Sequence, residues 1–255
     1  MLTGIKDVLI ISTSTDTPRF KELLGDGSQF GIKLSYKVQP SPDGLAQAFT
    51  LGEDFINGEP CAMVLGDNIF HGNGFTNMLK GAAEDARKGR ATVFGYYVND
   101  PERFGVVEFD KSGKAISIEE KPANPKSNYA VTGLYFYPSG VSQKAAEVKP
   151  SKRGEVEITS LNEMYIKEER LIVQQLGRGC AWLDTGTIHS LIDASNFVKT
   201  VQERTGVSIS AIEEIAYTNG WIDRDRLRNS AAFYGKSTYD RHLKAIADGR
   251  FFRKE

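Results

Sequence analysis

The sequence predicts an α/β protein with a Rossmann-like, mostly parallel sheet that carries helices on both faces, an inserted β-hairpin region and a C-terminal helical annex. Over the first hundred residues, short apolar runs alternate with amphipathic segments, which is typical of a parallel sheet covered by helices. After Asp100 the pattern changes to paired strands, and from Ser210 onward it is only helical. We therefore expect an α/β body over residues 1–208 and a helical annex over residues 209–255.

Local patterns predict the individual elements. Apolar and β-branched residues bounded by polar ones predict a strand at residues 7–12, and Pro18 favours the first turn of a short helix at 18–24. The other expected strands lie at residues 34–38, 62–65, 91–98, 129–138 and 171–176, with a hairpin over 104–122 that turns at 111–114. The other expected helices lie at residues 44–55, 75–87, 157–169 and 187–203, followed by three helical segments in the tail.

The charge of the chain is balanced. Lys and Arg number 32 and Asp and Glu 33, so no basic face is expected to attract nucleic acid or a membrane surface. No apolar run reaches the length of a membrane span or of a signal-peptide core. The two cysteines, Cys61 and Cys180, match neither a zinc site nor a disulfide framework, which favours a reducing cytoplasm.

Two aspartates follow apolar runs at the expected ends of strands. Asp67 lies in "VLGDNIFHG" and Asp184 in "GCAWLDTGT", where Thr187 is a candidate N-cap for the helix that follows. Ligands of open parallel sheets bind beyond the carboxyl ends of the strands, and Mg²⁺ commonly takes one or two carboxylates together with substrate phosphates. The alternative is that each aspartate only caps or bonds its own turn. Both interpretations remain open from the pattern alone.

Two further stretches contain side chains suited to a phosphorylated ligand. In "QPSPDGLAQAF", Gln39 offers both a donor and an acceptor for a base edge, and Gly44 would allow a ligand to approach the backbone closely. In "EEKP", Glu120 is suited to sugar hydroxyls and Lys121 to a phosphate. A structural loop and a solvated charged face are the respective alternatives.

Taken together, these stretches resemble the sugar-phosphate nucleotidyltransferases, and most closely the glucose-1-phosphate thymidylyltransferases. The similarity extends over nearly the whole chain and includes "QPSPDGLAQAF", "LGDNIFHGNGF", "DPERFGVVEFD", "EEKPANPKSNYAVTGLYFY", "RGEVEITSLN" and "WLDTGTIHSLIDASNFV". The resemblance implies a Mg²⁺-dependent reaction of dTTP with glucose 1-phosphate that gives dTDP-glucose and pyrophosphate, for deoxysugar pathways such as rhamnose synthesis. It also implies a homo-oligomer, by resemblance a tetramer, with helices of the tail in the subunit contacts.

The resemblance assigns roles to particular residues. Asp67 and Asp184 match the metal-binding aspartates, and Lys121 matches a lysine near the sugar phosphate, so these three are the expected catalytic residues. Gln39 and Gly44 match the loop that reads the thymine. The positions expected around the glucose are Gly105, Glu120, Val131, Trp182 and Arg153.

One family feature does not occur in this sequence. The family opens with a strand and a glycine-rich loop of the type G-G-x-G-T-R-L, which grips the triphosphate, whereas Met1 aligns just beyond that unit. We expect a βαβ piece of about 30 residues or more to be missing, which would leave the strand at 7–12 without a neighbour. The chain could then be a weak or inactive nucleotide-sugar-binding protein. A related transferase that prefers UTP is a further alternative.

Overall fold

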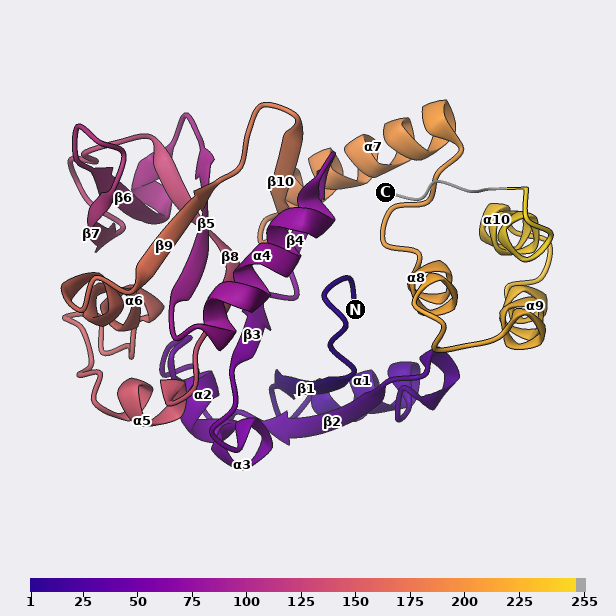
Figure 1. Ribbon diagram of the computed structural model, residues 1–255, viewed down its shortest axis with the longest axis horizontal. Coiled ribbons are helices and arrows are strands. Elements are labelled where there is room, and N and C mark those ends of the chain that lie inside the picture. Colours follow the sequence, from indigo (N-terminus) through magenta and orange to yellow (C-terminus); the bar gives the residue numbers. More distant parts are fainter. Residues whose placement is uncertain (251–255) are drawn as a thin grey trace. The chain divides into compact units, whose positions relative to one another are not determined.

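The computed structural model describes residues 1–250 and divides them into two compact units. The first unit comprises residues 1–10, 15–36 and the chain from 184 onward, and the second comprises residues 11–14 and 37–183. Figure 1 labels the elements of both units. The prediction of a body over 1–208 and an annex over 209–255 stays a prediction, and positions 251–255 of that annex lie outside the described residues.

The second unit contains most of the strands. Its helices are α2 (Gln47–Leu51), α3 (Glu53–Ile56), α4 (Phe75–Arg87), α5 (Val141–Ala146) and α6 (Ile158–Lys167), with a short 3-10 turn η2 (Pro101–Arg103). Its strands are β3 (Cys61–Val64), β4 (Asn68–Gly72), β5 (Ala91–Tyr97), β6 (Gly105–Phe109), β7 (Ala115–Glu120), β8 (Tyr129–Tyr137), β9 (Leu171–Gln175) and β10 (Cys180–Asp184), of which the last residue belongs to the first unit.

The main sheet of this unit has six strands in the order β7-β6-β8-β5-β9, with β3 paired to β8 as well. The α/β class is confirmed, as is the hairpin of β6 and β7. The expectation of a mostly parallel sheet needs a correction for this six-stranded sheet. Here β8 runs antiparallel to β3, β5 and β6, and β7 runs antiparallel to β6. Among these six strands only β5 and β9 pair in parallel. The three partners of β8 all run in the opposite direction to it, so every pairing that β8 makes is antiparallel and the sheet is mixed.

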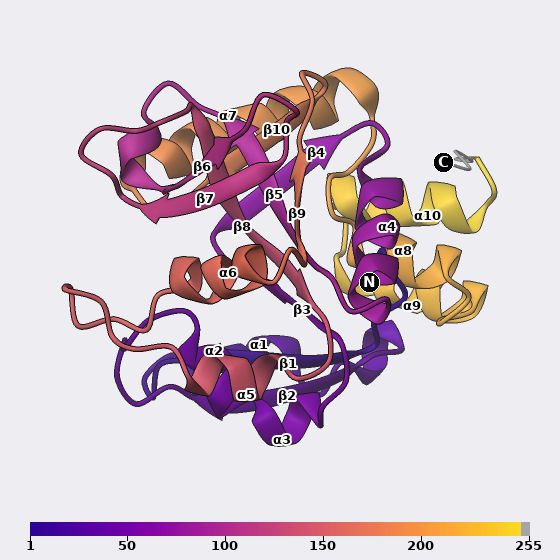
Figure 2. The ribbon, with the colours of Figure 1, turned by 60° about the vertical axis from the view of Figure 1, so that its left-hand side comes forward.

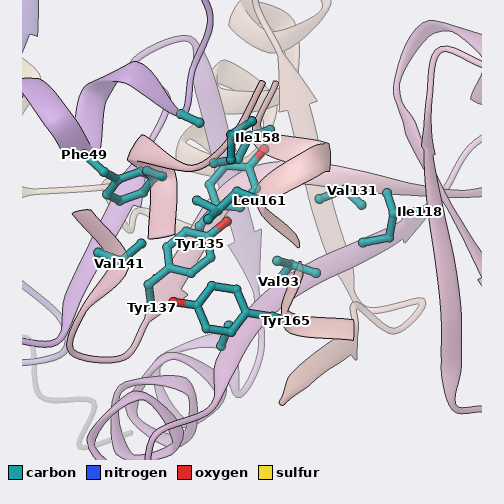
Figure 3. Close-up of a cluster of buried hydrophobic side chains, with 14 of the residues drawn as sticks. Phe49, Val93, Ile118, Val131, Tyr135, Tyr137, Val141, Ile158, Leu161 and Tyr165 are labelled. Carbon is teal, nitrogen blue, oxygen red and sulfur yellow. The ribbon is translucent and has the colours of Figure 1, made fainter. Parts of the chain in front are cut away.

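Helices cover both faces of this sheet, as predicted. On one face, α4 contributes Phe75, whose ring contacts Phe94 of β5, and Phe94 in turn contacts Phe136 of β8. On the other face, Tyr137 of β8 packs against Phe49 of α2 and Tyr165 of α6 (Figure 3). Phe136 and Tyr137 face opposite sides because neighbouring strand residues alternate. In Figure 2, α4 and α6 lie on opposite sides of β8 and β9.

The strand β8 contains an irregularity that matters for the site. Val93 and Gly95 of β5 are two residues apart, but their partners on β8, Tyr135 and Val131, are four apart. Two extra residues of β8 therefore form a bulge between these partners, and Gly133 lies in the middle of it. Bulges re-aim the backbone locally and are common beside functional sites.

Two strands belong to a smaller sheet that the sequence interpretation did not contain. The strand β4 pairs with β10, more than a hundred residues later in the chain. The sequence predicts a turn after residue 65, and a turn does form there, but a new strand begins immediately at Asn68. The helix predicted over 44–55 is also interrupted, since α2 ends and α3 begins at Gly52.

The first unit combines an N-terminal segment with the C-terminal helices. Its elements are β1 (Asp7–Ser12), α1 (Thr17–Leu24), η1 (Ser28–Phe30), β2 (Lys33–Val38), α7 (Ile188–Thr205), α8 (Ile212–Thr218), α9 (Arg224–Phe233) and α10 (Thr238–Ala247). The strands β1 and β2 pair with each other, and their last residues belong to the second unit. Among residues 1–250, no helix has the length and apolar character to cross a membrane.

Side-chain caps and a small core stabilise the helices of the first unit. Thr187 caps α7 through a reciprocal capping box with Ser190, as the sequence predicts for Thr187. Asp223 and Ser237 cap α9 and α10 through one bond each, without a reciprocal bond. The core of these helices consists of Ala216, Ile222, Leu227, Ala231, Leu243, Ile246 and Ala247. The helical character predicted for the tail is therefore confirmed up to Ala247.

Candidate functional site

The turn between β3 and β4 presents the first predicted aspartate. The N–H of Leu65 donates to the carbonyl of Gly133 at 2.9 Å, and the N–H of Asn68 donates to the carbonyl of Leu65 at 3.2 Å. These bonds fix a tight turn in which Asp67 is exposed. The side chain of Asn68 donates from Nδ2 to Asp67 Oδ1 at 2.7 Å. The carboxylate of Asp67 is thus held at the end of an apolar strand, where the sequence predicted it.

Asn68 is the centre of a hydrogen-bond junction that the sequence interpretation missed. Its Oδ1 accepts the indole N–H of Trp182 at 2.6 Å and the backbone N–H of Gly133 at 3.0 Å. Trp182 is 9% exposed, and its ring contacts those of Tyr96 and Phe104 edge-on. The one available signal was Gly133, because an isolated glycine in an apolar strand often marks a close backbone approach.

A second cluster forms where β6, β7 and α6 meet. Gly105 lies directly opposite Glu120 in the hairpin register. Glu120 Oε2 accepts the hydroxyl of Thr159 at 2.5 Å, and its Oε1 lies 3.8 Å from Nη1 of Arg153. A Cβ at Gly105 would lie 3.2 Å from Thr159 Oγ1 and 3.3 Å from Glu120 Oε2. Three of the residues predicted around the glucose are therefore brought together, and Thr159 joins them.

Arg153 is held by several carboxylates. Besides Glu120, its guanidinium lies 3.1 Å from Glu155 and 3.4 Å from Glu157. Glu157 is 7% exposed and also accepts a bond from Ser151. This network keeps a cation beside Glu120, although Arg153 itself remains 45% exposed in its side chain. Its strength is limited by solvent screening.

Lys121 has an unusual backbone. Its φ is 44°, in the left-handed region that residues other than glycine seldom adopt. Its N–H donates to the carbonyl of Phe104 at 2.9 Å, which continues the hairpin for one more bond. The side chain is exposed. A left-handed lysine at the end of β7 is strained, and strain of this kind is concentrated at functional positions.

The loop that contains Gln39 and Gly44, which is predicted to contact the thymine, is held by hydrogen bonds between its own side chains and those of the helix that follows. Gln39 donates from Nε2 to Gln47 Oε1 at 2.6 Å, and Gln47 donates to Asp43 Oδ2 at 2.8 Å. Gly44 has a φ of 115°, and a Cβ there would lie 2.6 Å from the backbone nitrogen of Val156. The loop therefore needs a glycine at this position in order to pack on the segment before α6. A contact of Gln39 or Gly44 with a base stays a prediction.

Asp184 ends β10 and belongs to the first unit. Its Oδ1 accepts the N–H of Gly186 at 2.8 Å in the turn that leads to the capped helix α7. This bond is the local turn contact that the sequence offered as the alternative role, and it leaves the metal role a prediction. Val131, the remaining predicted sugar-side residue, is 9% exposed and belongs to the core cluster of the second unit.

The oxygen donors suit a hard cation such as Mg²⁺. Among residues 1–250, no three His, Cys, Asp or Glu side chains form a metal-binding group. Mg²⁺ does not require three, since one or two carboxylates suffice when substrate phosphates supply further oxygens. The exposed carboxylate of Asp67, with one oxygen bonded by Asn68, fits that pattern.

The chain is a nucleotidyl transferase. The profile of the nucleotidyl transferase family matches residues 1–201. A glucose-1-phosphate thymidylyltransferase of Xanthomonas campestris pv. campestris (strain B100) is 56% identical over 247 residues, 97% of this chain and 83% of the relative. One of Neisseria meningitidis serogroup A is 55% identical over 243 residues, 95% of this chain and 84% of that relative. The chain belongs to the glucose-1-phosphate thymidylyltransferase family.

Solved structures agree with this assignment. A Bacillus anthracis protein described as a glucose-1-phosphate thymidylyltransferase, in complex with sucrose, superposes with a TM-score of 0.69 at 39% identity. That comparison covers 76% of this chain and 77% of the other. A UDP-glucose pyrophosphorylase complexed with UDP-glucose gives a TM-score of 0.64 at 25% identity, over 78% of this chain and 83% of the other.

Proposed function

We propose that this protein transfers a thymidylyl group from dTTP to glucose 1-phosphate. A phosphate oxygen of glucose 1-phosphate attacks the α-phosphorus of dTTP, a new P–O bond forms, and the bond from the α-phosphorus to the bridging oxygen breaks. The products are dTDP-glucose and pyrophosphate. The observation that carries the proposal is the 56% identity over 97% of the chain to a protein named for this activity.

We propose a task in this reaction for several of the chain's own residues, and the geometry supports each proposal. Glu120, held by Thr159 and beside Arg153, is suited to accept hydrogen bonds from sugar hydroxyls. The missing side chain of Gly105 leaves room opposite that carboxylate. Lys121 supplies a positive charge at the end of the same hairpin for the sugar phosphate. Positioning and charge neutralisation of this kind are the main needs of phosphoryl transfer.

Asp67 and Asp184 are the residues that would hold a divalent cation, which we propose to be Mg²⁺. When bound, such an ion supplies neutralisation of phosphate charge. The protein's part is to keep the carboxylates in place, and for Asp67 the bond from Asn68 does so. Asp184 is the last residue of β10, and Asp67 lies in the turn between β3 and β4.

A pyrophosphate-release assay with a nucleotide panel tests the proposal. We expect turnover with dTTP and glucose 1-phosphate to exceed that with UTP, to stop when a chelator removes divalent cations, and to return with Mg²⁺. A preference for UTP would instead favour a uridylyl transferase, for which the likeness to a UDP-glucose pyrophosphorylase is the supporting observation. Binding of dTDP-glucose without turnover would leave a nucleotide-sugar-binding chain.

A homo-oligomer, by resemblance a tetramer, is part of the same proposal. On α7, Ile188, Leu191 and Ile192 are 78%, 52% and 52% exposed, although all three are large and apolar. Apolar side chains grouped on one helix commonly mark a protein contact. A cytoplasmic location and a role in deoxysugar synthesis are likewise proposed, and the two unpaired thiols of Cys61 and Cys180 suit a reducing compartment.

A further inference from the structure

Asn68 joins three strands at the edge of the candidate site. It begins β4, it accepts a bond from Gly133 of β8 and another from Trp182 of β10, and it donates to Asp67 in the preceding turn. We propose that Asn68 is a positioning residue, which Trp182 and Gly133 hold in one amide orientation so that its Nδ2 fixes the carboxylate of Asp67. The consequence for turnover rests on the function proposed above.

The orientation of the amide follows from its neighbours. Trp182 Nε1 and the backbone nitrogen of Gly133 are both donors, and neither can accept a hydrogen bond. The atom of Asn68 that faces them at 2.6 and 3.0 Å must therefore be the oxygen. The nitrogen is then left to face Asp67 Oδ1 at 2.7 Å. A rotated amide would set N–H groups against N–H groups on one side and oxygen against a carboxylate on the other.

The backbone is shaped to accept this amide. A Cβ added to Gly133 would lie 2.6 Å from Asn68 Oδ1 and 2.8 Å from Leu65 Cδ1, so any other residue would displace the amide or the turn. Gly133 also lies in the two-residue bulge of β8, and its carbonyl accepts the N–H of Leu65. The backbone N–H and the backbone carbonyl of Gly133 therefore both bond to the Leu65–Asn68 turn.

At the far end of the junction, Trp182 is closely packed. The ring of Trp182 packs edge-on against Tyr96 at 5.9 Å and against Phe104 at 5.1 Å, and the residue is 9% exposed. The indole N–H therefore has one direction in which to donate. The packed ring of Trp182 thus orients the amide of Asn68, and that amide orients the exposed carboxylate of Asp67. A group held in place before the substrates arrive loses less entropy when they bind.

Asn68→Asp separates this role from general packing. A carboxylate at position 68 has nearly the same shape, and it still accepts from Trp182 and Gly133. It replaces the donor that faces Asp67 by a second negative oxygen, so the two carboxylates repel at 2.7 Å. Asn77→Asp is the matched control, because it makes the same chemical change at an exposed position in the first turn of α4, where a carboxylate is tolerated.

The kinetic arm measures pyrophosphate release for both variants and for Trp182→Phe. We expect Asn68→Asp to lower kcat by at least about 100-fold, with much smaller changes in KM, since displacement of a group by an ångström has effects of that size. Trp182→Phe keeps most of the ring contact but removes the N–H, and we expect a loss of about fivefold to tenfold. If Asn68→Asp matches Asn77→Asp while its melting temperature is unchanged, the proposal is wrong.

A spectroscopic arm tests the junction without relying on activity. The chain has two tryptophans, so ¹⁵N-indole labelling gives two cross-peaks, and Trp221→Phe identifies the one from Trp182. We expect the Trp182 N–H to exchange slowly in the wild type and in Asn68→Asp. In Asn68→Leu it should shift and exchange faster. An unchanged Trp182 signal in Asn68→Leu would show that the indole N–H does not bond to Asn68.

The two arms separate failure of this inference from failure of the proposed function. A wild-type chain that releases no pyrophosphate from dTTP and glucose 1-phosphate contradicts the proposed function, and the indole signals still decide whether the junction exists. If the wild-type chain turns over normally but the indole signal is unchanged in Asn68→Leu, the proposed function stands and the junction is rejected. Asp67→Ala should leave the Trp182 signal in place, because the two donors alone orient the amide.

Discussion

The hydroxyl of Thr159 donates a 2.5 Å hydrogen bond to Oε2 of Glu120, although the two residues are 39 positions apart in the chain. Thr159 is 6% exposed and lies in the first turn of α6, whereas Glu120 is the last residue of β7. With Arg153 near the other oxygen, the carboxylate is held from two sides. Glu120 can therefore present one fixed orientation to a ligand.

Thr159→Val should weaken the use of glucose 1-phosphate. Valine keeps the shape of threonine but cannot donate, so Glu120 loses one of the two groups that orient it. We expect KM for glucose 1-phosphate to rise by about fivefold to tenfold, as for the loss of one hydrogen bond, with little effect on KM for dTTP. Initial rates at varied concentrations of each substrate give both values. Thr159→Ser keeps the hydroxyl and is the control, and equal KM values for the two variants would refute the role.

Replacement of Lys121 by glycine should raise stability and lower activity. Its φ of 44° costs about 1 kcal/mol or more for a residue with a Cβ, and glycine avoids that cost. We therefore expect Lys121→Gly to raise the free energy of unfolding by up to about 1 kcal/mol. Turnover should fall by about 100-fold or more because the positive charge proposed to lie beside the sugar phosphate is lost. Urea unfolding and pyrophosphate release measure the two effects.

Lys121→Ala separates the two contributions. Alanine loses the charge but keeps a Cβ, so it should lose activity to the same extent and gain no stability. A Lys121→Gly variant that is less stable than the wild type would show that the left-handed backbone is not strained.

Gly44→Ala should destabilise the protein strongly. The added Cβ would lie 2.6 and 2.7 Å from backbone atoms of Val156, and the φ of 115° is unfavourable for alanine. We expect a loss of about 3 kcal/mol or more in the free energy of unfolding. Gly58→Ala is the control, because Gly58 also has a positive φ of 74° but has nothing within 4 Å of an added Cβ. That variant should lose about 1 kcal/mol, and similar losses for both would argue against the packing of the loop on Val156.

Alkaline pH should destabilise the second unit through its buried tyrosines. Burial raises the pKa of Tyr135 and Tyr137 and raises the pKa of Tyr165 to about 12. The folded-state pKa lies above the unfolded value of about 10, so the neutral hydroxyls favour the folded state. Their full contribution is present below about pH 10 and is lost as the pH rises toward the folded pKa values. Urea unfolding at several pH values, together with tyrosinate absorbance, checks this expectation.

Tyr165→Phe is the informative variant for the alkaline effect. The Tyr165 hydroxyl is buried without a hydrogen-bond partner among the described residues, so its removal should leave stability unchanged or slightly higher at neutral pH. The decline above pH 10 should become shallower. A steeper decline in this variant would contradict the assigned cause.

The elements with strong local signals could be predicted from the sequence. The helix at Phe75–Arg87 has the predicted bounds because its apolar residues recur at helical spacing, and Thr187 caps α7 as its position suggested. The strand pairing could not be predicted in this way. The antiparallel course of β8 and the partnership of β4 with β10 depend on contacts between distant segments. The sequence pattern within a short segment does not indicate which distant strand it pairs with.

The candidate site shows the same division. Resemblance of motifs led to Gly105, Glu120 and Arg153, which the fold brings together. It did not lead to Asn68 or Thr159, because their importance lies in bonds to residues far away in the chain. A side chain that orients another side chain leaves little trace in a linear pattern.

The bulge in β8 makes the effect of a deletion in this strand depend on how many residues are removed. A deletion of one residue between Val131 and Tyr135 would turn every later side chain of the strand to the opposite face, and Tyr137 would leave its aromatic partners. A deletion of two residues would restore ordinary pairing with β5 and keep the tyrosines inside. The shortened strand would no longer bring a backbone N–H to Asn68. Gene-shuffling experiments that cross this segment could therefore yield well-folded proteins that have lost their chemistry.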